Sequence, residues 1–235
     1  NLAGYDAATI GNHEFDYGYP NFKEITKDAK FPVISANVLY NGKAENAHTV
    51  FTADSGEKIG VFGLTTPESG TKAHPAKIQG VTFPAGKDMF AIAEAEVKAL
   101  EDEGCDYIVC LSHLGIDDES KGNRSIDLLE AVEGIDVLID GHSHSTIDKV
   151  AEAAGETVEA MEPQGAVITG ETPVVYGEEG KTLVTSTGTK LANVGVVVLS
   201  EEAAFARSVP VESIAVDGVK EISDRAAAIQ KQIDD

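Results

Sequence analysis

The sequence predicts a mixed α/β fold, because short apolar runs alternate with stretches that have helical periodicity. The hydrophobic share of 42% in 235 residues is enough for a sizeable core. Runs typical of strands lie at 7–10, 32–38, 58–64, 107–111, 137–139, 182–187 and 194–199. The part after Leu183 is richer in strands and turns, so we expect α/β with some α+β character rather than a purely doubly wound sheet.

Two stretches between these runs have the pattern of amphipathic helices. Residues 86–103 place four apolar side chains on one face at helical spacing, namely Phe90, Ala93, Val97 and Leu100. Residues 123–132 predict a second helix, with Asn123 or Ser125 as its N-cap.

Two further segments are harder to assign. Residues 146–181 are rich in Glu, Gly, Thr and Pro without periodicity, which favours an insertion or long loop. The tail 217–235 is amphipathic at helical spacing and predicts a helix that either packs on the domain or links to another one. We therefore expect one catalytic domain over 1–217 and a linker helix over 218–235.

The charge excludes some partners. With 18 basic and 40 acidic residues, the net charge of −22 repels nucleic-acid polymers and anionic lipid. A small anionic substrate would need a strongly positive group in its site, for which a bound metal is the obvious candidate. No apolar run is long enough for a membrane span. Cys105 and Cys110 lie at an odd offset around one strand, so we expect two buried thiols and no disulfide.

One apparent metal motif fails on its residue types. The stretch from Asp117 has a Gly at the sixth position, as a calcium loop does. Lys121 and Leu128 stand at the fifth and twelfth positions, where such a loop needs oxygen ligands. We interpret the stretch as a polar loop before a helix.

Three segments share one arrangement, in which an apolar run ends abruptly in histidine. "YDAATI" runs into "GNHEFD", "DYIVCL" into "SHLG", and "DVLID" into "GHSHS". Ligands of open α/β sheets bind beyond the carboxyl ends of the strands. If the three strands are neighbours in one sheet, one rim collects Asn12, His13, His113, His142 and His144.

The distribution of histidines supports a metal site. Four of the six histidines lie in these segments, whereas His48 and His74 are expected in solvated loops or at edges. One histidine at a strand end is usually structural, but four at equivalent positions favour a transition metal. Imidazole is the commonest ligand of such metals, and an Asn amide adds a neutral oxygen.

The same segments carry a family resemblance. "GNHEFDYG", "SHLGID" and "GHSHS", with "SANV" at 35–38 and "GLTTPES" at 63–69, resemble blocks of the calcineurin-like metallophosphoesterases, and most of all the 5′-nucleotidase branch. The resemblance implies a four-layer αββα sandwich and hydrolysis of nucleotide phosphoesters by two divalent metals, Zn or Mn. It leaves open a 2′,3′-cyclic-nucleotide phosphodiesterase or a UDP-sugar hydrolase. A binding or scaffold module that keeps the fold without activity is the alternative from another class.

The resemblance also implies a role for each site residue. Three side chains match the ligands of one metal: Asn12, His113 and His142. His144 matches a ligand of the other metal. His13 matches the catalytic histidine, which would stabilise the phosphoryl oxygens or the leaving group, and Asp16 the carboxylate that orients it. Glu14 is left as a supporting residue without a ligand role. Nothing in the sequence identifies the residues that bind the rest of the substrate.

Some parts of the family pattern do not occur in the sequence. An Asp-x-His block and a Gly-Asp block are expected upstream of Asn12, and a nucleotide-binding domain after the final helix. We therefore expect a fold incomplete at the N-terminus and a missing N-terminal segment and C-terminal domain. The chain should bind at most one metal tightly and hydrolyse nucleotides poorly or not at all. The family resemblance also implies an extracellular, cell-surface or periplasmic location.

Overall fold

The computed structural model describes residues 1, 3–161, 171–200, 204–213 and 230–231. Its α-helices are α1 (Tyr19–Thr26), α2 (Ser69–Lys72), α3 (Lys87–Asp102), α4 (Ser125–Ala131) and α5 (Ile147–Ala153). The strands are β1 (Ala8–Thr9), β2 (Val33–Ile34), β3 (Leu39–Tyr40), β4 (Lys43–Ala44), β5 (His48–Thr52), β6 (Lys58–Thr65), β7 (Val81–Thr82), β8 (Tyr107–His113), β9 (Val137–Asp140), β10 (Val158–Met161), β11 (Thr172–Tyr176), β12 (Leu183–Ser186), β13 (Asn193–Leu199) and β14 (Ala204–Pro210). Short 3-10 turns include η1 (His13–Phe15).

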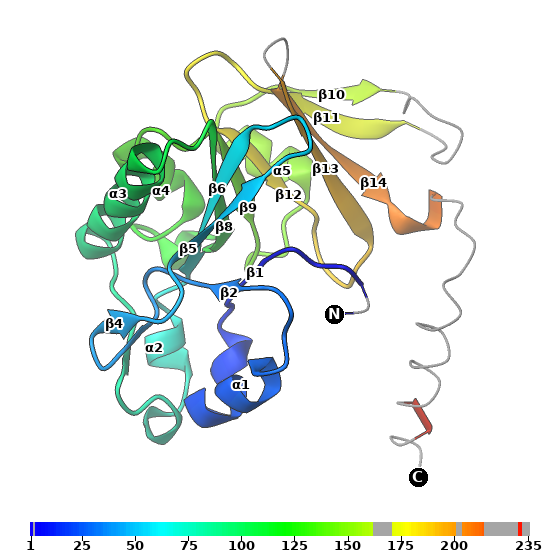
Figure 1. Cartoon of the computed structure of the whole chain (residues 1–235). Helices are drawn as coiled ribbons and strands as arrows, with labels where there is room; N and C mark the ends of the chain where they lie inside the picture. Colours follow the sequence, from blue (N-terminus) through cyan, green and yellow to red (C-terminus); the bar gives the residue numbers. More distant parts are fainter. Residues whose placement is uncertain (2, 162–170, 201–203, 214–229, 232–235) are drawn as a thin grey trace.

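A five-stranded sheet forms the centre of the molecule, in the order β12-β9-β8-β6-β5 (Figure 1). β12, β9, β8 and β6 run parallel, and β5 is an antiparallel edge strand. Parallel strands are covered on both faces, which explains their nearly continuous apolar runs. Because the four strands are parallel, β8 and β9 end at the same edge of the sheet. His113 is the last residue of β8, and His142 follows two residues after the end of β9.

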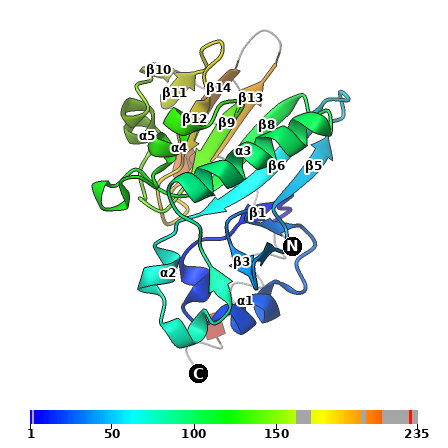
Figure 2. The same cartoon turned by 90° about the vertical axis from the view of Figure 1, so that its left-hand side faces the viewer.

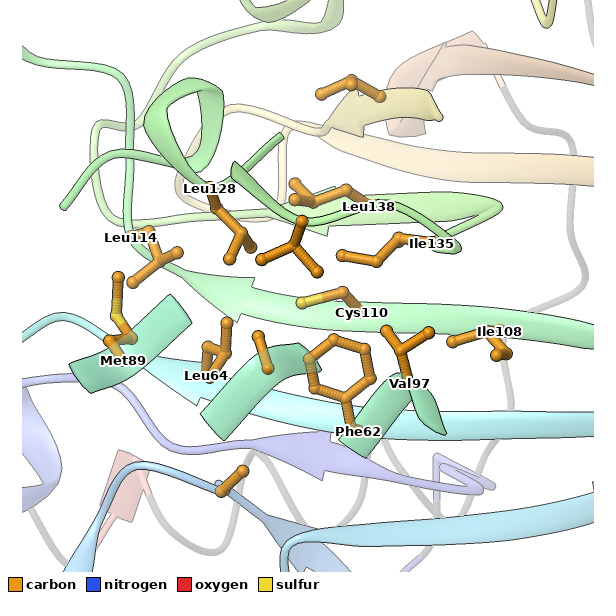
Figure 3. Close-up of a cluster of buried hydrophobic side chains, with 14 of the residues drawn as sticks. Phe62, Leu64, Met89, Val97, Ile108, Cys110, Leu114, Leu128, Ile135 and Leu138 are labelled. Atoms are coloured by element: carbon orange, nitrogen blue, oxygen red, sulfur yellow. The ribbon is translucent and has the colours of Figure 1, made fainter. Parts of the chain in front are cut away.

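Helices α3 and α4 cover one face of this sheet, and Figure 2 shows α3 lying across it. Figure 3 shows the core between them, which includes Phe62, Leu64, Leu128 and Leu138. The predicted face of α3 is confirmed, with one shift: Met89 is fully buried and Phe90 only partly. The flexible Met89 side chain therefore fills the core position at the start of the helix that the spacing had given to Phe90.

Neither N-cap prediction for α4 holds. The N-cap is Arg124, and the Asp127 carboxylate accepts from its backbone N–H. Asn123 instead accepts from the backbone N–H of Gly86, just before α3, and the Ser125 hydroxyl donates to the Gly115 carbonyl. Both polar side chains are used to join loops, which local sequence cannot reveal.

The other face carries α5 and an antiparallel sheet in the order β10-β11-β14-β13. Two of these strands and α5 fall within 146–181, so our prediction of a loop there is wrong for the described residues. The helix was missed because it is short. Its buried side chains Ile147 and Ala151 pack between the two sheets, whereas the buried Val150 joins the core that includes Leu128 and Leu138. β10 and β11 pair with each other. Because cross-strand contacts largely determine such strands, the sequence of each one shows little hydrophobic periodicity.

β1 does not join the central sheet, although the sequence had suggested that the strands before Asn12, His113 and His142 are neighbours in one sheet. It pairs in parallel with β2 alone, and this two-stranded sheet packs against β6 and β8. The approach is close because Gly63 of β6 has no side chain: a Cβ there would lie 2.4 Å from the Ile34 carbonyl oxygen. The buried Thr65 hydroxyl donates to the Ile10 carbonyl at 2.7 Å, which ties the end of β1 beside the end of β6.

Replacing Gly63 by Ala is expected to lower the free energy of unfolding by roughly 1–3 kcal/mol or more, because a backbone atom must move. Gly60→Ala on the same strand is the matched control. Its Cβ would meet the Leu100 side chain at 2.8 Å and the Cys105 Sγ at 2.9 Å, which are side-chain atoms that can rotate away. Urea denaturation of both variants measures the difference, and an equal loss would contradict the proposed approach of β2.

A second stability prediction concerns Glu156, which follows α5. Burial, with a smaller contribution from Glu178, raises the pKa of this carboxyl from 4.5 to about 7. Since the folded state favours the protonated form, the native state loses stability as pH rises between these values. Glu156→Gln should therefore be more stable than wild type by about 1 kcal/mol near pH 8, and the gain should disappear near pH 4. Thermal denaturation at both pH values measures this, and an equal gain at both would contradict it.

Other expectations are met or lie outside the described residues. Cys105 and Cys110 are free thiols, of which only Cys110 is fully buried. His48 lies on the edge strand β5, as expected, and His74 in a loop. The tail helix predicted over 217–235 falls almost wholly outside the described residues. Within the described part of the chain, no helix has the length and apolarity to span a bilayer.

Candidate metal and phosphoester site

The "GNHEFD" segment forms a 3-10 turn directly after β1, and its buried residue explains its orientation. Phe15 is fully buried and packs edge-on against Phe83, with ring centroids 5.0 Å apart. Because Phe15 points into the core, the preceding Asn12 and His13 lie toward the outer side of the turn. The segment therefore presents polar side chains beside the ends of β6 and β8.

Asn12, His113 and His142 come together at this rim, as the sequence predicted. The Asn12 Oδ1 lies 2.9 Å from His113 Nε2 and 3.2 Å from His142 Nδ1. The two imidazole rings have their centroids 5.1 Å apart. These side chains come from three separate segments. The parallel pairing of β8 with β9 brings His113 and His142 together, and the hydrogen bond from Thr65 to the Ile10 carbonyl holds the segment of Asn12 beside them.

Glycines make room for these rings. A Cβ on Gly11 would lie 3.1 Å from His113 Nε2, and one on Gly141 would lie 3.1 Å from His113 Nδ1. In the following loop, His142 and His144 both adopt left-handed backbone conformations, with φ of 72° and 55°. Strained conformations of this kind are common where a side chain must point in a functionally required direction.

The electrostatics favour a neutral His113. Burial, with smaller contributions from positive charge on His142, His13 and His144, lowers the pKa of its imidazole to about 4. A neutral imidazole is the form that binds a metal.

The donor set fits a divalent transition metal. Ligand atoms that each lie about 2.0–2.2 Å from one metal are separated by about 2.8–3.6 Å in tetrahedral or octahedral geometry. Both separations from Asn12 Oδ1 fall in this range. Among the described residues, no three His, Cys, Asp or Glu side chains form a metal-binding group, since this cluster has two histidines and an amide. It would supply three ligands of one metal and leave further positions for water or substrate.

His13 and Asp16 lie beside this cluster as a pair. The His13 Nδ1 is 2.8 Å from Asp16 Oδ2, and both side chains are largely exposed. The contact favours a proton on Nδ1 and leaves Nε2 free. Lys77 donates from Nζ to the Asp16 backbone carbonyl and lies 5.4 Å from the centre of the Tyr17 ring. One cationic side chain therefore adjoins the pair on a strongly acidic protein.

The remaining predicted site residues take less central positions. His144 is exposed, and it lies close enough to His113 that its positive charge lowers the pKa of that imidazole, which places it at the same rim. The Glu14 carboxylate accepts from the Gly11 backbone N–H at 2.8 Å, which supports the turn. Whether any of these side chains binds metal or acts in catalysis stays a prediction.

Glu68 is a site residue that sequence reasoning missed. Its Oε2 lies 3.4 Å from His142 Nε2, on the ring edge opposite Asn12, and its side chain is 15% exposed. It also contacts Lys72 and Ser120. Burial raises its pKa, but these partners and His142 outweigh it, so the pKa lies below the ordinary value. The segment "GLTTPES" contains it, yet nothing in that string indicates that its Glu meets a histidine 74 residues away.

Comparison with known proteins finds relatives among nucleotide phosphoesterases and nucleotidases. The chain is 31% identical over 172 residues to the trifunctional nucleotide phosphoesterase protein YfkN of Bacillus subtilis, covering 66% of this chain and 11% of that protein. It is 34% identical over 152 residues to the NAD 5′-nucleotidase of Haemophilus influenzae, covering 61% and 23%. The chain thus spans a tenth to a quarter of these relatives. No protein-family model matches it.

Solved structures show the same fold. A 5′-nucleotidase structure from Staphylococcus aureus, in complex with α-ketoglutarate, superposes with a TM-score of 0.66 at 26% identity over 92% of this chain and 39% of that one. The calcineurin-like phosphoesterase YfkN gives a TM-score of 0.71 at 22% identity over 98% of this chain and 71% of that one. The mixed α/β sandwich predicted from the sequence is confirmed. The chain is therefore homologous to nucleotide phosphoesterases and 5′-nucleotidases, and it has the fold of the calcineurin-like phosphoesterases.

Proposed function

We propose that the chain contains the catalytic site of a metal-dependent hydrolase of nucleotide phosphoesters, of 5′-nucleotidase type. The convergence of Asn12, His113 and His142 carries this proposal, because it joins a three-donor set from distant segments at one edge of the sheet. The names of the relatives support a nucleotide as substrate. The family resemblance also supports an extracellular or periplasmic location.

Each residue has a physical task in this proposal. Asn12, His113 and His142 would hold one metal, and His144 would contribute to a second. A divalent metal bound there supplies Lewis-acid activation of the phosphoryl group and of water. The His13 ring, held through Nδ1 by Asp16, presents Nε2 to donate a hydrogen bond or proton to the phosphoryl oxygens or the leaving group. Lys77 adds positive charge beside this pair.

A substrate panel tests the proposal. The purified chain with added Mn²⁺ or Zn²⁺ is incubated, in excess over substrate, with AMP, 2′,3′-cyclic AMP or UDP-glucose. Because His144 is the one proposed ligand of the second metal, we expect slow hydrolysis, with AMP fastest and a chelator abolishing it. Preference for the cyclic or sugar nucleotide would redirect the substrate assignment. Failure of the chain to bind either metal would contradict the proposal and favour a module without activity.

A further inference from the structure

Asp140 is a buried carboxylate at the end of β9, between two segments of the proposed metal site. Only 8% of the residue is exposed. Its Oδ1 accepts three hydrogen bonds, from Ser112 Oγ at 2.6 Å and from the backbone N–H groups of Leu114 and Gly115 at 3.2 Å each. One oxygen therefore contacts the chain both immediately before and immediately after His113.

The position of Asp140 in the sequence links this oxygen to the other imidazole. His142 follows two residues later, after Gly141. We propose that Asp140 is a positioning residue that fixes the two imidazoles, of His113 and His142, relative to each other; this rests on the proposed function, in which both bind metal. It acts through the backbone of the two strand ends and touches neither metal nor substrate.

The two turns that Asp140 connects also touch each other. Gly115 has a φ of 74°, and a Cβ on it would lie 3.0 Å from the Ser143 backbone nitrogen and 3.3 Å from His142 Cδ2. The turn after His113 therefore packs directly on the turn that carries His142. If the backbone N–H groups of Leu114 and Gly115 lose Asp140 Oδ1 as their shared acceptor, the backbone should shift in both turns and move the imidazole rings of His113 and His142.

The second oxygen of the carboxylate adds no further anchor. Asp140 Oδ2 is buried and has no hydrogen-bond partner within the described part of the chain. Because a buried polar oxygen without a partner is unfavourable, the hydrogen bonds that offset the burial of Asp140 are the three that Oδ1 accepts around His113.

Asp136 provides a matched control in the same pair of strands. Its Oδ2 accepts from the Ile108 backbone N–H at 2.7 Å and so joins the start of β9 to the start of β8. It is the same type of contact between β9 and β8, but at the edge of the sheet away from the histidines. Removing it should affect stability without affecting the site.

The test uses nitrogen-15 NMR of the histidine rings in the metal-free chain, followed by calorimetric titration with Mn²⁺. In Asp140→Ala, the ring signals of His113 and His142 should shift while those of His48 and His74 stay, and Mn²⁺ affinity should fall about 10–100-fold. Asp140→Asn keeps an acceptor oxygen, so its ring signals and its Mn²⁺ affinity should both lie close to those of the unaltered chain. Asp136→Ala should change neither, although it lowers the melting temperature. Ser112→Ala, which removes one of the three bonds, is the milder variant if Asp140→Ala does not fold, and it should shift both rings partway.

The outcomes separate this proposal from the proposed function. Unchanged ring signals in folded Asp140→Ala or Ser112→Ala, or equal shifts in Asp136→Ala, would overturn the positioning role. If the unaltered chain does not bind Mn²⁺ at all, the proposed function fails, whereas the ring signals still decide whether Asp140 sets the two imidazoles.

Discussion

Replacing His113 by Ala is expected to remove the metal site. His113 is partly buried, and it is neutral because burial, with smaller contributions from the neighbouring histidines, lowers its pKa to about 4. Its Nε2 lies 2.9 Å from Asn12 Oδ1, so the variant loses one of the three proposed ligands and leaves the amide with His142 alone. Loss of a supporting residue alone costs about 10–100-fold in metal affinity, and loss of a ligand should cost more.

Calorimetric titration with Zn²⁺ and Mn²⁺ measures this loss. His48→Ala is the matched control. His48 is also partly buried, but it pairs with Glu96 of α3 and with Glu103, which directly follows α3. The control should bind metal as the unaltered chain does. Equal affinity in His113→Ala and His48→Ala would show that the metal binds elsewhere.

Replacing Asp16 by Ala should lower the rate of phosphoester hydrolysis on the order of 100-fold, because the His13 ring loses the partner that orients it. His13→Ala should cost a similar amount, and the double variant little more than either single one, since the two side chains act as a unit. Single-turnover assays with excess protein measure rates that are too slow for steady-state work.

Asp54→Ala controls for the loss of one exposed carboxylate, because Asp54 is exposed in the turn between β5 and β6. It should leave the rate unchanged. Additive losses in the double variant, or a normal rate in Asp16→Ala, would show that the 2.8 Å contact between His13 and Asp16 has no role in hydrolysis.

The central parallel strands and the longest helix could be predicted from the sequence because their signals are local. The runs that became β6, β8 and β9 are apolar over most of their length, as strands buried on both faces must be. Helix α3 is long enough to repeat its apolar spacing several times. Short elements such as α5 and β10 gave no such pattern, because long-range packing and strand pairing determine them.

The site shows the same division. His113 and His142 could be found because each follows an apolar run, and strands of one parallel sheet end at a common edge. Asn12 also follows an apolar run, but β1 reaches that edge by packing against β6 and β8 and not by joining the sheet. Glu68 could not, since its contact with His142 depends on a turn after β6 that brings it across the rim. Asp140 was hidden inside an apolar run, where only the three-dimensional structure reveals that its oxygen contacts both sides of His113.

The claim that Asn12, His113 and His142 bind one divalent metal is tested most directly by anomalous X-ray diffraction at the zinc edge, on crystals of the chain grown with Zn²⁺. We predict one strong anomalous peak about 2.0–2.2 Å from Asn12 Oδ1, His113 Nε2 and His142 Nδ1. A peak only at other residues, such as His48 with Glu96, or no peak at these three atoms at saturating Zn²⁺, would contradict it.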